Sequence, residues 1–349
     1  AMMVGVVETG SAQSLARNNL TVGAKTGTAE VDTFSGAEDT HAWVIAFAGP
    51  SGGEPELALA VIVEAVRTPV GIGKPEKGAL SGIHPVDLSA HVIDALISRV
   101  GIEPENVDDV IWGCVGQVGE QSSNIARNAA LAAGLPESVT GVSVDRQCGS
   151  SQQAVHFAAA AVMSGQMDVV IAGGVESMSR VPMFSNMAGG DGPFGPRMMS
   201  RYPDLVNQGI SAEMIADQWN LSRAMLDEIA AESQQRAARA TKDGLFDAEI
   251  TAVEASEAPV SHDQGIRPDT TATSLASLTP AFREDGVVTA GNSSQISDGA
   301  AAVLVTTSAR ARELGLTPMA RLHSFAMAGV DPVIMLTGPI PATSKVLAK

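Results

Sequence analysis

Positive charge is scarce in this sequence, which has 22 Lys and Arg residues against 39 Asp and Glu and a formal net charge of −17 at pH 7. Nucleic-acid-binding proteins carry a basic stripe or patch, and no such run interrupts the acidic balance here. No apolar run reaches the roughly 18 residues of a membrane-spanning helix, and the N-terminus lacks the basic and apolar regions of a signal peptide. We therefore expect a cytoplasmic protein with neither nucleic acid nor a membrane as its partner.

Cysteine is also rare, since Cys114 and Cys148 are the only two in the chain. Two cysteines cannot build a disulfide framework, and they suit a reducing compartment. The chain has 349 residues, of which 45% are hydrophobic. It is therefore long enough for two domains or for one large α/β domain with an ample core.

Strand-like and helix-like runs alternate along much of the chain. Short β-rich runs at 60–69, 108–117 and 168–174 are separated by helical patterns at 84–102 and 124–136. This alternation predicts an α/β fold with a mostly parallel sheet covered by helices. The 168–174 strand should be central because it has too few polar positions for an open face. The 84–102 helix should bury one face, formed by Leu88, Val92, Ala95 and Leu96.

From residue 178 the alternation of strands and helices stops. Met- and Gly-rich loops at 183–199 then lead to two further helices. These helices are predicted at 211–219 and 222–244, with Ser222 as the N-cap of the second and Gly244 as its stop. The loop methionines are flexible loop and core filler by default, and as part of a lid they would adapt to apolar ligands of different shape.

Residues 144–179 read as strand, sharp turn, helix and strand, with Cys148 at the turn. Apolar residues at helical spacing from Ala154 predict a buried helix face, formed by Phe157, Ala158, Ala161 and Val162. At the start of a helix the free N–H groups and the dipole favour an anion, so a thiol there ionises more easily. Gly149 would supply conformational freedom to the turn, and Ser150 and Ser151 have N-cap character.

Cys148 is our candidate nucleophile, although a lone cysteine is more often a small buried hydrophobic residue. The segments DRQCGSSQQA (145–154) and AGGVESMSRVPM (172–183) decide between the two readings, because they resemble the nucleophile segment of the thiolases. The resemblance runs from about residue 60 to 349. It implies a thiolase-like fold made of an N-terminal half (60–177), a loop domain (178–294) and the start of a C-terminal half (295–349).

In chemical terms the resemblance implies acyl transfer between a 3-ketoacyl-CoA and CoA through a thioester on Cys148. It implies no metal and no bound cofactor, with CoA acting as a substrate, and a homodimer or tetramer for a complete family member. Ser294 matches the position where a serine meets the pantetheine arm of CoA, and Met335 falls beside the acyl pocket. Asn207 and Gln208 stand where some members carry a His-Met pair close to CoA. For each of these residues a packing or surface role is the alternative.

Other residues with chemical potential are read as structural. Cys114 lies in a buried strand, and His84 opens a helix. His156 lies eight residues after Cys148 on the same helix, and about 100° of rotation per residue turns it away from the sulfur.

The first 64 residues resemble the C-terminal end of a penicillin-binding protein transpeptidase domain, through KTGTAEV (25–31) and HAWVIAF (41–47). In that family the motif Lys25, Thr26, Gly27 and the following Thr28 would line the active-site strand and bind a carboxylate. Without that role, the segment is an ordinary hairpin with an exposed lysine. Alternation predicts antiparallel strands around 43–47 and 57–61, joined by a turn at 49–55.

Two features lead us to expect a mosaic chain without thiolase turnover. Residues 60–64 would serve both family resemblances, with no linker between them. The family's N-E-A-F segment, its G-H-P segment with the activating histidine, and its C-x-G-G-G segment with the second cysteine do not occur before Lys349. The two alternative functions are a non-catalytic CoA-binding scaffold and a penicillin-binding fragment.

Overall fold

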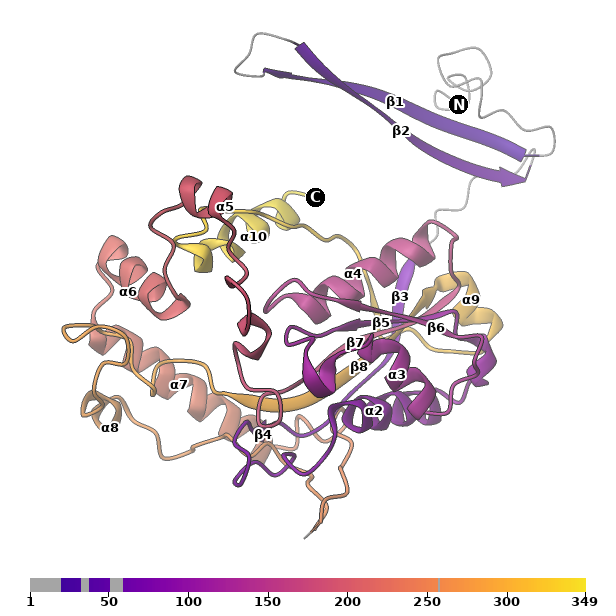
Figure 1. The fold of residues 1–349 in the computed structure, drawn as a ribbon. Coiled ribbons are helices and arrows are strands. Elements are labelled where there is room, and N and C mark those ends of the chain that lie inside the picture. Colours follow the sequence, from indigo (N-terminus) through magenta and orange to yellow (C-terminus); the bar gives the residue numbers. More distant parts are fainter. Residues whose placement is uncertain (1–19, 33–37, 51–58, 257) are drawn as a thin grey trace. The chain divides into compact units, whose positions relative to one another are not determined.

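The computed structural model describes residues 20–32, 38–50, 59–256 and 258–349. The chain divides into two compact units, residues 1–58 and 59–349, both of which are drawn in Figure 1.

The first unit contains one antiparallel pair, β1 (Leu20–Asp32) and β2 (Glu38–Pro50). The expected strand at 43–47 is confirmed, but its expected partner is wrong. The KTG run itself forms the neighbouring strand, with Thr26 opposite Val44, because its 13 residues can pair along the whole of β2. Val61 instead lies in β3 of the second unit. The expected turn and Leu57 fall largely in 51–58, outside the described residues.

The second unit is built on a seven-stranded sheet in the order β6-β5-β7-β8-β3-β9, with β4 beside β8. The strands are β3 (Ala60–Arg67), β4 (Gly71–Ile72), β5 (Asp109–Gly113), β6 (Thr140–Val144), β7 (Val169–Ser177), β8 (Ser297–Thr307) and β9 (Ala320–Arg321). The α/β class is confirmed, and β7 is central as expected.

The sheet is mixed in its pairing. Parallel pairing joins β6, β5 and β7, whereas β8 pairs antiparallel with β7, β3 and β4. β3 and β4 therefore run in the same direction as β7, and β8 is reversed. The physical reason lies in the connection between β7 and β8. More than one hundred residues separate them, so the chain does not return through the single crossover helix that keeps consecutive strands parallel.

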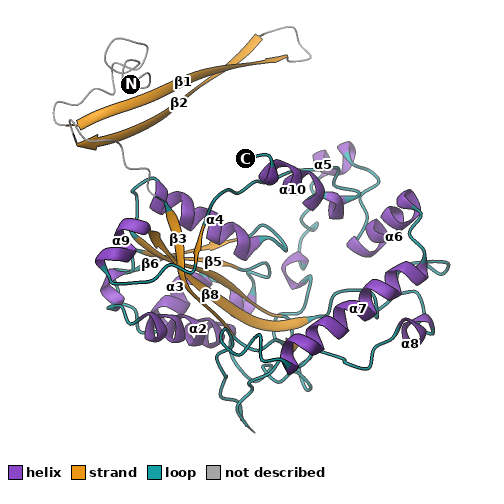
Figure 2. Ribbon diagram, turned by 180° about the vertical axis from the view of Figure 1, so that it is seen from behind, coloured by secondary structure: helices purple, strands orange, loops and turns teal. Residues whose placement is uncertain are grey.

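Helices cover both faces of this sheet, as Figures 1 and 2 show. On one face lie α2 (Pro85–Val100) and α3 (Ile125–Ala132), and on the other lies α4 (Ser150–Met163). The side chains of β5 alternate between the two cores, because Val110 and Trp112 pack with α2 and α3 while Ile111 packs with α4. The expected helices at 84–102 and 124–136 are confirmed, and Gly134 follows α3 with φ +76°.

The buried face of α4 differs from the expected one at two positions. Phe157 is 44% exposed and Ala161 is only partly buried, whereas Ala159 is buried together with Ala154, Ala158 and Val162. The alanines bring the helix close to the sheet, which leaves no depth for an aromatic ring on that side.

The segment between β7 and β8 carries η4 (Ser185–Met187), α5 (Pro196–Arg201), α6 (Gln208–Trp219), α7 (Arg223–Lys242) and α8 (Ala272–Ala276). Both expected helices of this segment are confirmed. Ser222 caps α7 by accepting a hydrogen bond from Met225 N–H at 3.3 Å, and Gly244 follows with φ +69°. The remaining short elements are η2 (Pro104–Asn106), η3 (Gly119–Gln121), α9 (Ser308–Glu313), η5 (Met335–Thr337) and α10 (Pro339–Leu347).

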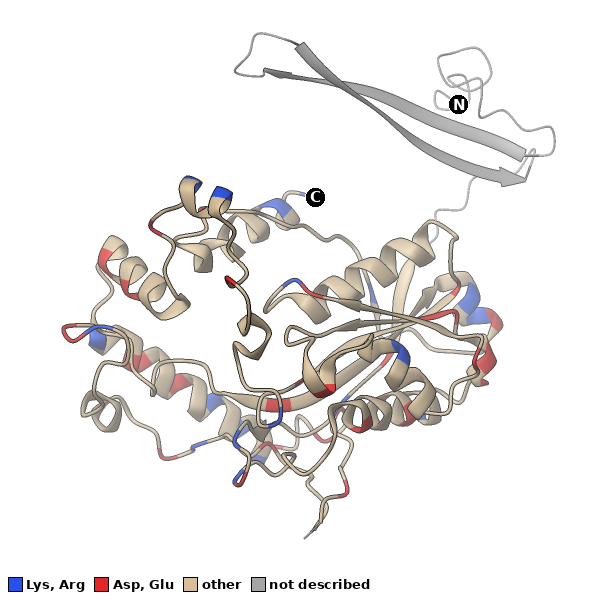
Figure 3. Cartoon of the chain, in the orientation of Figure 1, with Lys and Arg blue, Asp and Glu red and all other residues tan. Residues whose placement is uncertain are grey.

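Over the second unit, Figure 3 shows Lys and Arg interspersed with Asp and Glu. Within the part of the chain that the structure describes, no helix combines the length and the apolar character needed to cross a membrane.

Candidate active site

Cys148 lies at the edge of the sheet where the three parallel strands end. β6 ends at Val144 and β5 at Gly113, which are paired to each other, and β7 continues to Ser177. The chain passes from β6 through Cys148 directly into α4, and the Cys148 side chain is exposed. This edge, outside the carboxyl ends of parallel strands, is where α/β proteins bind their ligands.

The turn that carries Cys148 is held by side chains on either side of it. Asp145 Oδ1 accepts a hydrogen bond from Gln147 N–H at 2.7 Å. Ser150 Oγ accepts from Arg146 N–H at 2.9 Å and donates to the Gln147 carbonyl at 2.6 Å. The backbone N–H of Cys148 itself donates to no other described residue.

Two details of this turn differ from the expectation. The residue with a left-handed backbone is Gln147, with φ +48°, while Gly149 has an ordinary φ of −95°. Ser150 and Ser151 are the first residues of α4 and not its N-caps, and no described side chain caps this helix. Ser150 N–H donates to the Gln147 carbonyl at 3.0 Å. Ser151 N–H and Gln152 N–H have no partner among the described residues and keep their capacity for an anionic ligand.

Glycines allow α4 to start directly on the sheet. A Cβ atom on Gly113 of β5 would overlap the Ser151 backbone nitrogen, and one on Gly174 of β7 would overlap the Ser151 hydroxyl. Two neighbouring strands therefore support the first turn of α4 through bare backbone. The sequence analysis missed this role, and the only available signal was a glycine near the end of each strand.

The loop after β5 is fastened to β7 beside this turn. The Glu176 carboxylate accepts hydrogen bonds from Val115 N–H at 2.9 Å, Gly116 N–H at 3.1 Å and Gln121 Nε2 at 2.7 Å. Gln121 Oε1 in turn accepts from Ser177 N–H at 2.8 Å. Sequence reasoning missed this network, because its members lie far apart in the chain.

Cys114 begins that loop, one residue after β5 ends, and is 1% exposed. Burial, with smaller contributions from the negative charges of Glu176 and Asp145, raises the pKa of its thiol to about 12. The expected core role is confirmed. Of the two cysteines, only Cys148 presents its sulfur to solvent.

Neither histidine close to these elements is hydrogen-bonded to Cys148. His84 is the N-cap of α2, where its Nδ1 accepts from Val86 N–H at 3.2 Å, so the expected structural role is confirmed. The His156 ring stacks on Phe325 with 5.1 Å between ring centroids. Burial, and then the charge of Arg146, lower the pKa of His156.

The other four candidate residues lie at the start of α6, in η5 and in the loop before β8. Asn207 caps α6 through a 3.0 Å hydrogen bond from Ile210 N–H to its Oδ1, and Gln208 is the exposed first residue of that helix. Met335, 39% exposed, opens η5, which packs against α6. Ser294 is exposed in the loop before β8. Among the described residues, no hydrogen bond joins any of the four to the Cys148 turn.

The loop that carries Ser294 is anchored through its neighbour Asn292. The Asn292 side chain accepts from Thr289 N–H at 2.7 Å and donates to Asp227 of α7 at 3.0 Å. Asn292, two residues before Ser294, is thus structural, which leaves the Ser294 hydroxyl free at the surface.

The Lys25, Thr26, Gly27 and Thr28 motif lies in β1, opposite residues 42–45 of β2. Its side chains fall outside what the structure describes, so its expected role stays a prediction.

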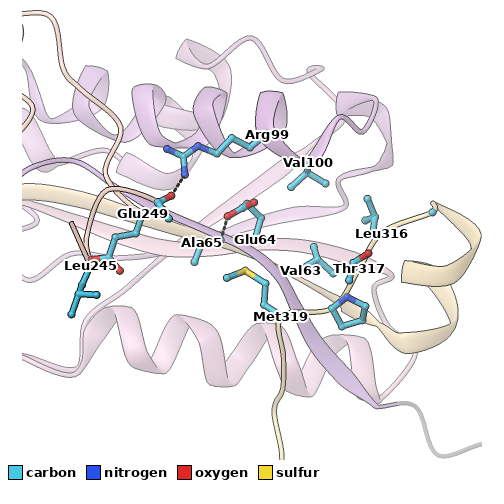
Figure 4. A pocket seen from close by; sticks show the side chains of 13 residues that line it. Val63, Glu64, Ala65, Arg99, Val100, Leu245, Glu249, Leu316, Thr317 and Met319 are labelled. Atoms are coloured by element: carbon cyan, nitrogen blue, oxygen red, sulfur yellow. Dashed lines mark hydrogen bonds between the residues drawn. The ribbon is translucent and has the colours of Figure 1, made fainter. Parts of the chain in front are cut away.

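A separate pocket of about 950 Å³ lies away from these candidates, between β3, the end of α2 and the segments 245–249 and 315–319 (Figure 4). Arg99 on its wall donates to the carbonyls of Ala248 and Ile250 at 2.6 and 3.1 Å. None of the expected site residues lines it. Over the described ranges, no three His, Cys, Asp or Glu side chains gather as ligands for a metal ion.

Comparison with known proteins identifies the family to which the second unit is similar. The family model for the thiolase N-terminal domain matches residues 60–309. The chain belongs to the thiolase family. The family model for the penicillin-binding protein transpeptidase domain matches residues 1–79, in line with the motif in β1.

Individual thiolases give the same result. The chain is 46% identical to a steroid 3-ketoacyl-CoA thiolase from Mycobacterium tuberculosis, over 83% of this chain and 72% of that protein. It is 47% identical to a 3-ketoacyl-CoA thiolase from Cronobacter sakazakii, over 83% and 75%. The crystal structure of the Bacillus anthracis acetyl-CoA acetyltransferase superposes with a TM-score of 0.73 at 38% identity, covering 84% of this chain and 76% of that one. The thiolase-like fold is thereby confirmed.

Proposed function

We propose that this thiolase transfers an acyl group between a 3-ketoacyl-CoA and CoA through a thioester on Cys148. The observation that carries the proposal is the position of Cys148, an exposed thiol at the uncapped amino end of α4. A thiolate is favoured there by the free N–H groups and by the helix dipole.

The reaction has two steps. In the first, the Cys148 thiolate attacks the keto carbon, the bond between that carbon and the α-carbon breaks, and acetyl-CoA leaves as an enolate that takes up a proton. In the second, the CoA thiol gives up its proton and attacks the acyl thioester, which releases acyl-CoA and restores the Cys148 thiolate. Negative charge develops on an oxygen in each step, and the free N–H of Cys148 is a donor for it.

CoA and acyl-CoA are the proposed partners, with CoA as a substrate and without a resident metal or cofactor. We assign contacts with CoA and the acyl chain to Asn207, Gln208, Ser294 and Met335. The packing of α6 against η5 supports this assignment, because it brings the first two of these residues into one region with Met335. An unbridged nucleophilic thiol also suits the cytoplasm, and assembly as a homodimer or tetramer belongs to the same proposal.

The test is transfer of an acetyl group from acetyl-CoA to the protein, which is the second step run in reverse. We expect peptide mass spectrometry to find an acetyl thioester on Cys148, released by hydroxylamine, in the wild type and in Cys114→Ala but not in Cys148→Ala. Acetylation elsewhere, or none, would overturn the proposal. Thiolysis of acetoacetyl-CoA by the same sample measures turnover through both steps.

A further inference from the structure

We propose that Ser150 is a positioning residue, which holds the turn of Cys148 in the shape needed for acyl transfer. The inference rests on the proposed function, because Cys148 is the nucleophile in both.

The Ser150 hydroxyl spans the residues that precede Cys148. It accepts a hydrogen bond from Arg146 N–H at 2.9 Å and donates its own hydrogen to the Gln147 carbonyl at 2.6 Å. Ser150 is only 4% exposed, so water cannot readily replace either bond. A single hydroxyl is thereby used as donor and as acceptor, within one turn of chain around the thiol.

We call these two hydrogen bonds of the Ser150 hydroxyl the Ser150 clamp. The backbone of Gln147 explains why the Ser150 clamp is needed. Its φ of +48° lies in the left-handed region, which is unfavourable for a residue that has a Cβ atom. The contact from Gln147 N–H to Asp145 at 2.7 Å and the Ser150 bond to the Gln147 carbonyl favour this conformation. Without the hydroxyl, Arg146 N–H loses its acceptor, and of the two Ser150 bonds to the Gln147 carbonyl only that from the backbone N–H, at 3.0 Å, remains. Gln147 is then freer to return to the right-handed region, and Cys148 as the next residue must move with it.

The start of α4 has a separate anchor. Ser151 rests on the bare backbone of Gly113 and Gly174, and these contacts do not involve the Ser150 hydroxyl. Loss of that hydroxyl should therefore alter the turn more than the helix. This separation makes a positioning role distinguishable from a general role in folding.

The experiment uses the full chain with Ser150→Ala, Ser150→Thr and Ser164→Ala. Ser164 is a matched control at the other end of α4, where its exposed hydroxyl donates to the Ala161 carbonyl at 2.9 Å. The rate of Cys148 acetylation is measured against acetyl-CoA concentration, together with iodoacetamide alkylation and the melting temperature. Hydrogen exchange of the peptide that contains Arg146 reports the clamp directly.

We expect Ser150→Ala to lower the limiting acetylation rate by roughly 10- to 100-fold, since misplacement of a reacting group by about 1 Å has effects of this size. The acetyl-CoA concentration at half-saturation, the rate of alkylation of the exposed thiol and the melting temperature should change little. Ser150→Thr should recover most of the rate, and Ser164→Ala should match the wild type. Only Ser150→Ala should lose protection of the Arg146 N–H.

Wild-type acetylation by Ser150→Ala would overturn the inference, as would a parallel fall in acetylation, alkylation and melting temperature. If the wild type itself accepts no acetyl group, the proposed function fails. Hydrogen exchange still tests the Ser150 clamp in that case. Unchanged protection of the Arg146 N–H in Ser150→Ala would show that Ser150 does not hold the turn.

Discussion

Gly174 of β7 faces the Ser151 hydroxyl of α4 so closely that no side chain fits between them. Gly174→Ala should therefore push the start of α4 away from the sheet and lower the free energy of unfolding by about 1–3 kcal/mol, as overpacking does. It should also slow acetylation of Cys148. Urea unfolding and the acetyl-CoA assay measure the two effects. Gly82→Ala is the control, because nothing lies within 4 Å of a Cβ atom there, and equal effects of both variants would contradict the steric argument.

The two thiols should differ sharply in reactivity. Cys114 is 1% exposed and its pKa is raised to about 12 by burial, whereas Cys148 is exposed. At mildly alkaline pH we expect iodoacetamide to label Cys148 alone, and Cys148→Ala to abolish labelling of the folded chain, since thiolates are the reactive form. In urea both cysteines should react. Labelling of Cys114 in the folded protein would show that the loop after β5 opens.

Asp298 predicts a pH-dependent stability. The residue is 1% exposed, its Oδ1 accepts a 2.9 Å hydrogen bond from Ser179 N–H, and its Oδ2 has no partner among the described residues. Burial raises the pKa of this carboxyl despite the bond from Ser179. Folding therefore favours the protonated form. Its contribution to stability is complete below the ordinary pKa of Asp and is lost as the pH rises through the raised pKa.

Asp298→Asn stays neutral and keeps an oxygen for Ser179 N–H. The free energy of unfolding of this variant, relative to the wild type, should increase with pH across that window. Urea unfolding at a series of pH values checks this expectation. Parallel pH profiles for the two proteins would show that Asp298 does not titrate as its burial predicts.

Glu213 ties α6 to the segment before β8. Its fully buried carboxylate accepts hydrogen bonds from Val287 N–H and Val288 N–H, both at 2.9 Å. Glu213→Ala should leave one buried and one partly buried N–H group unpaired and lower the free energy of unfolding by about 2–5 kcal/mol. Glu213→Gln retains one acceptor oxygen, so its free energy of unfolding should lie between those of Glu213→Ala and the wild type. If Glu213→Ala unfolds in urea with the same midpoint as the wild type, this prediction is contradicted.

Local signals in the sequence predicted the elements well. The helix at 84–102 is predicted from apolar spacing and the helix at 222–244 from the residues that begin and end it, and the structure places caps at His84 and Ser222. These features depend on contacts between residues three or four apart, which the sequence displays directly. Cys148 was placed correctly between a strand and a helix for the same reason.

Features that depend on distant parts of the chain could not be predicted. The direction of β8 follows from the long path after β7, and the partner of β2 follows from the competing strand around Thr26. The exposure of Phe157 depends on how closely α4 approaches the sheet. The left-handed backbone of Gln147 is set by Asp145 and Ser150 together, and no rule based on residue type alone would select glutamine for it.

Peptide groups of β5 and β7, rather than side chains, form the floor beneath the first turn of α4. The height of the Cys148 thiol above the sheet is consequently set by contacts between backbones and not by side-chain packing. Exchanges among the apolar side chains elsewhere in the two cores can alter stability while leaving that height untouched.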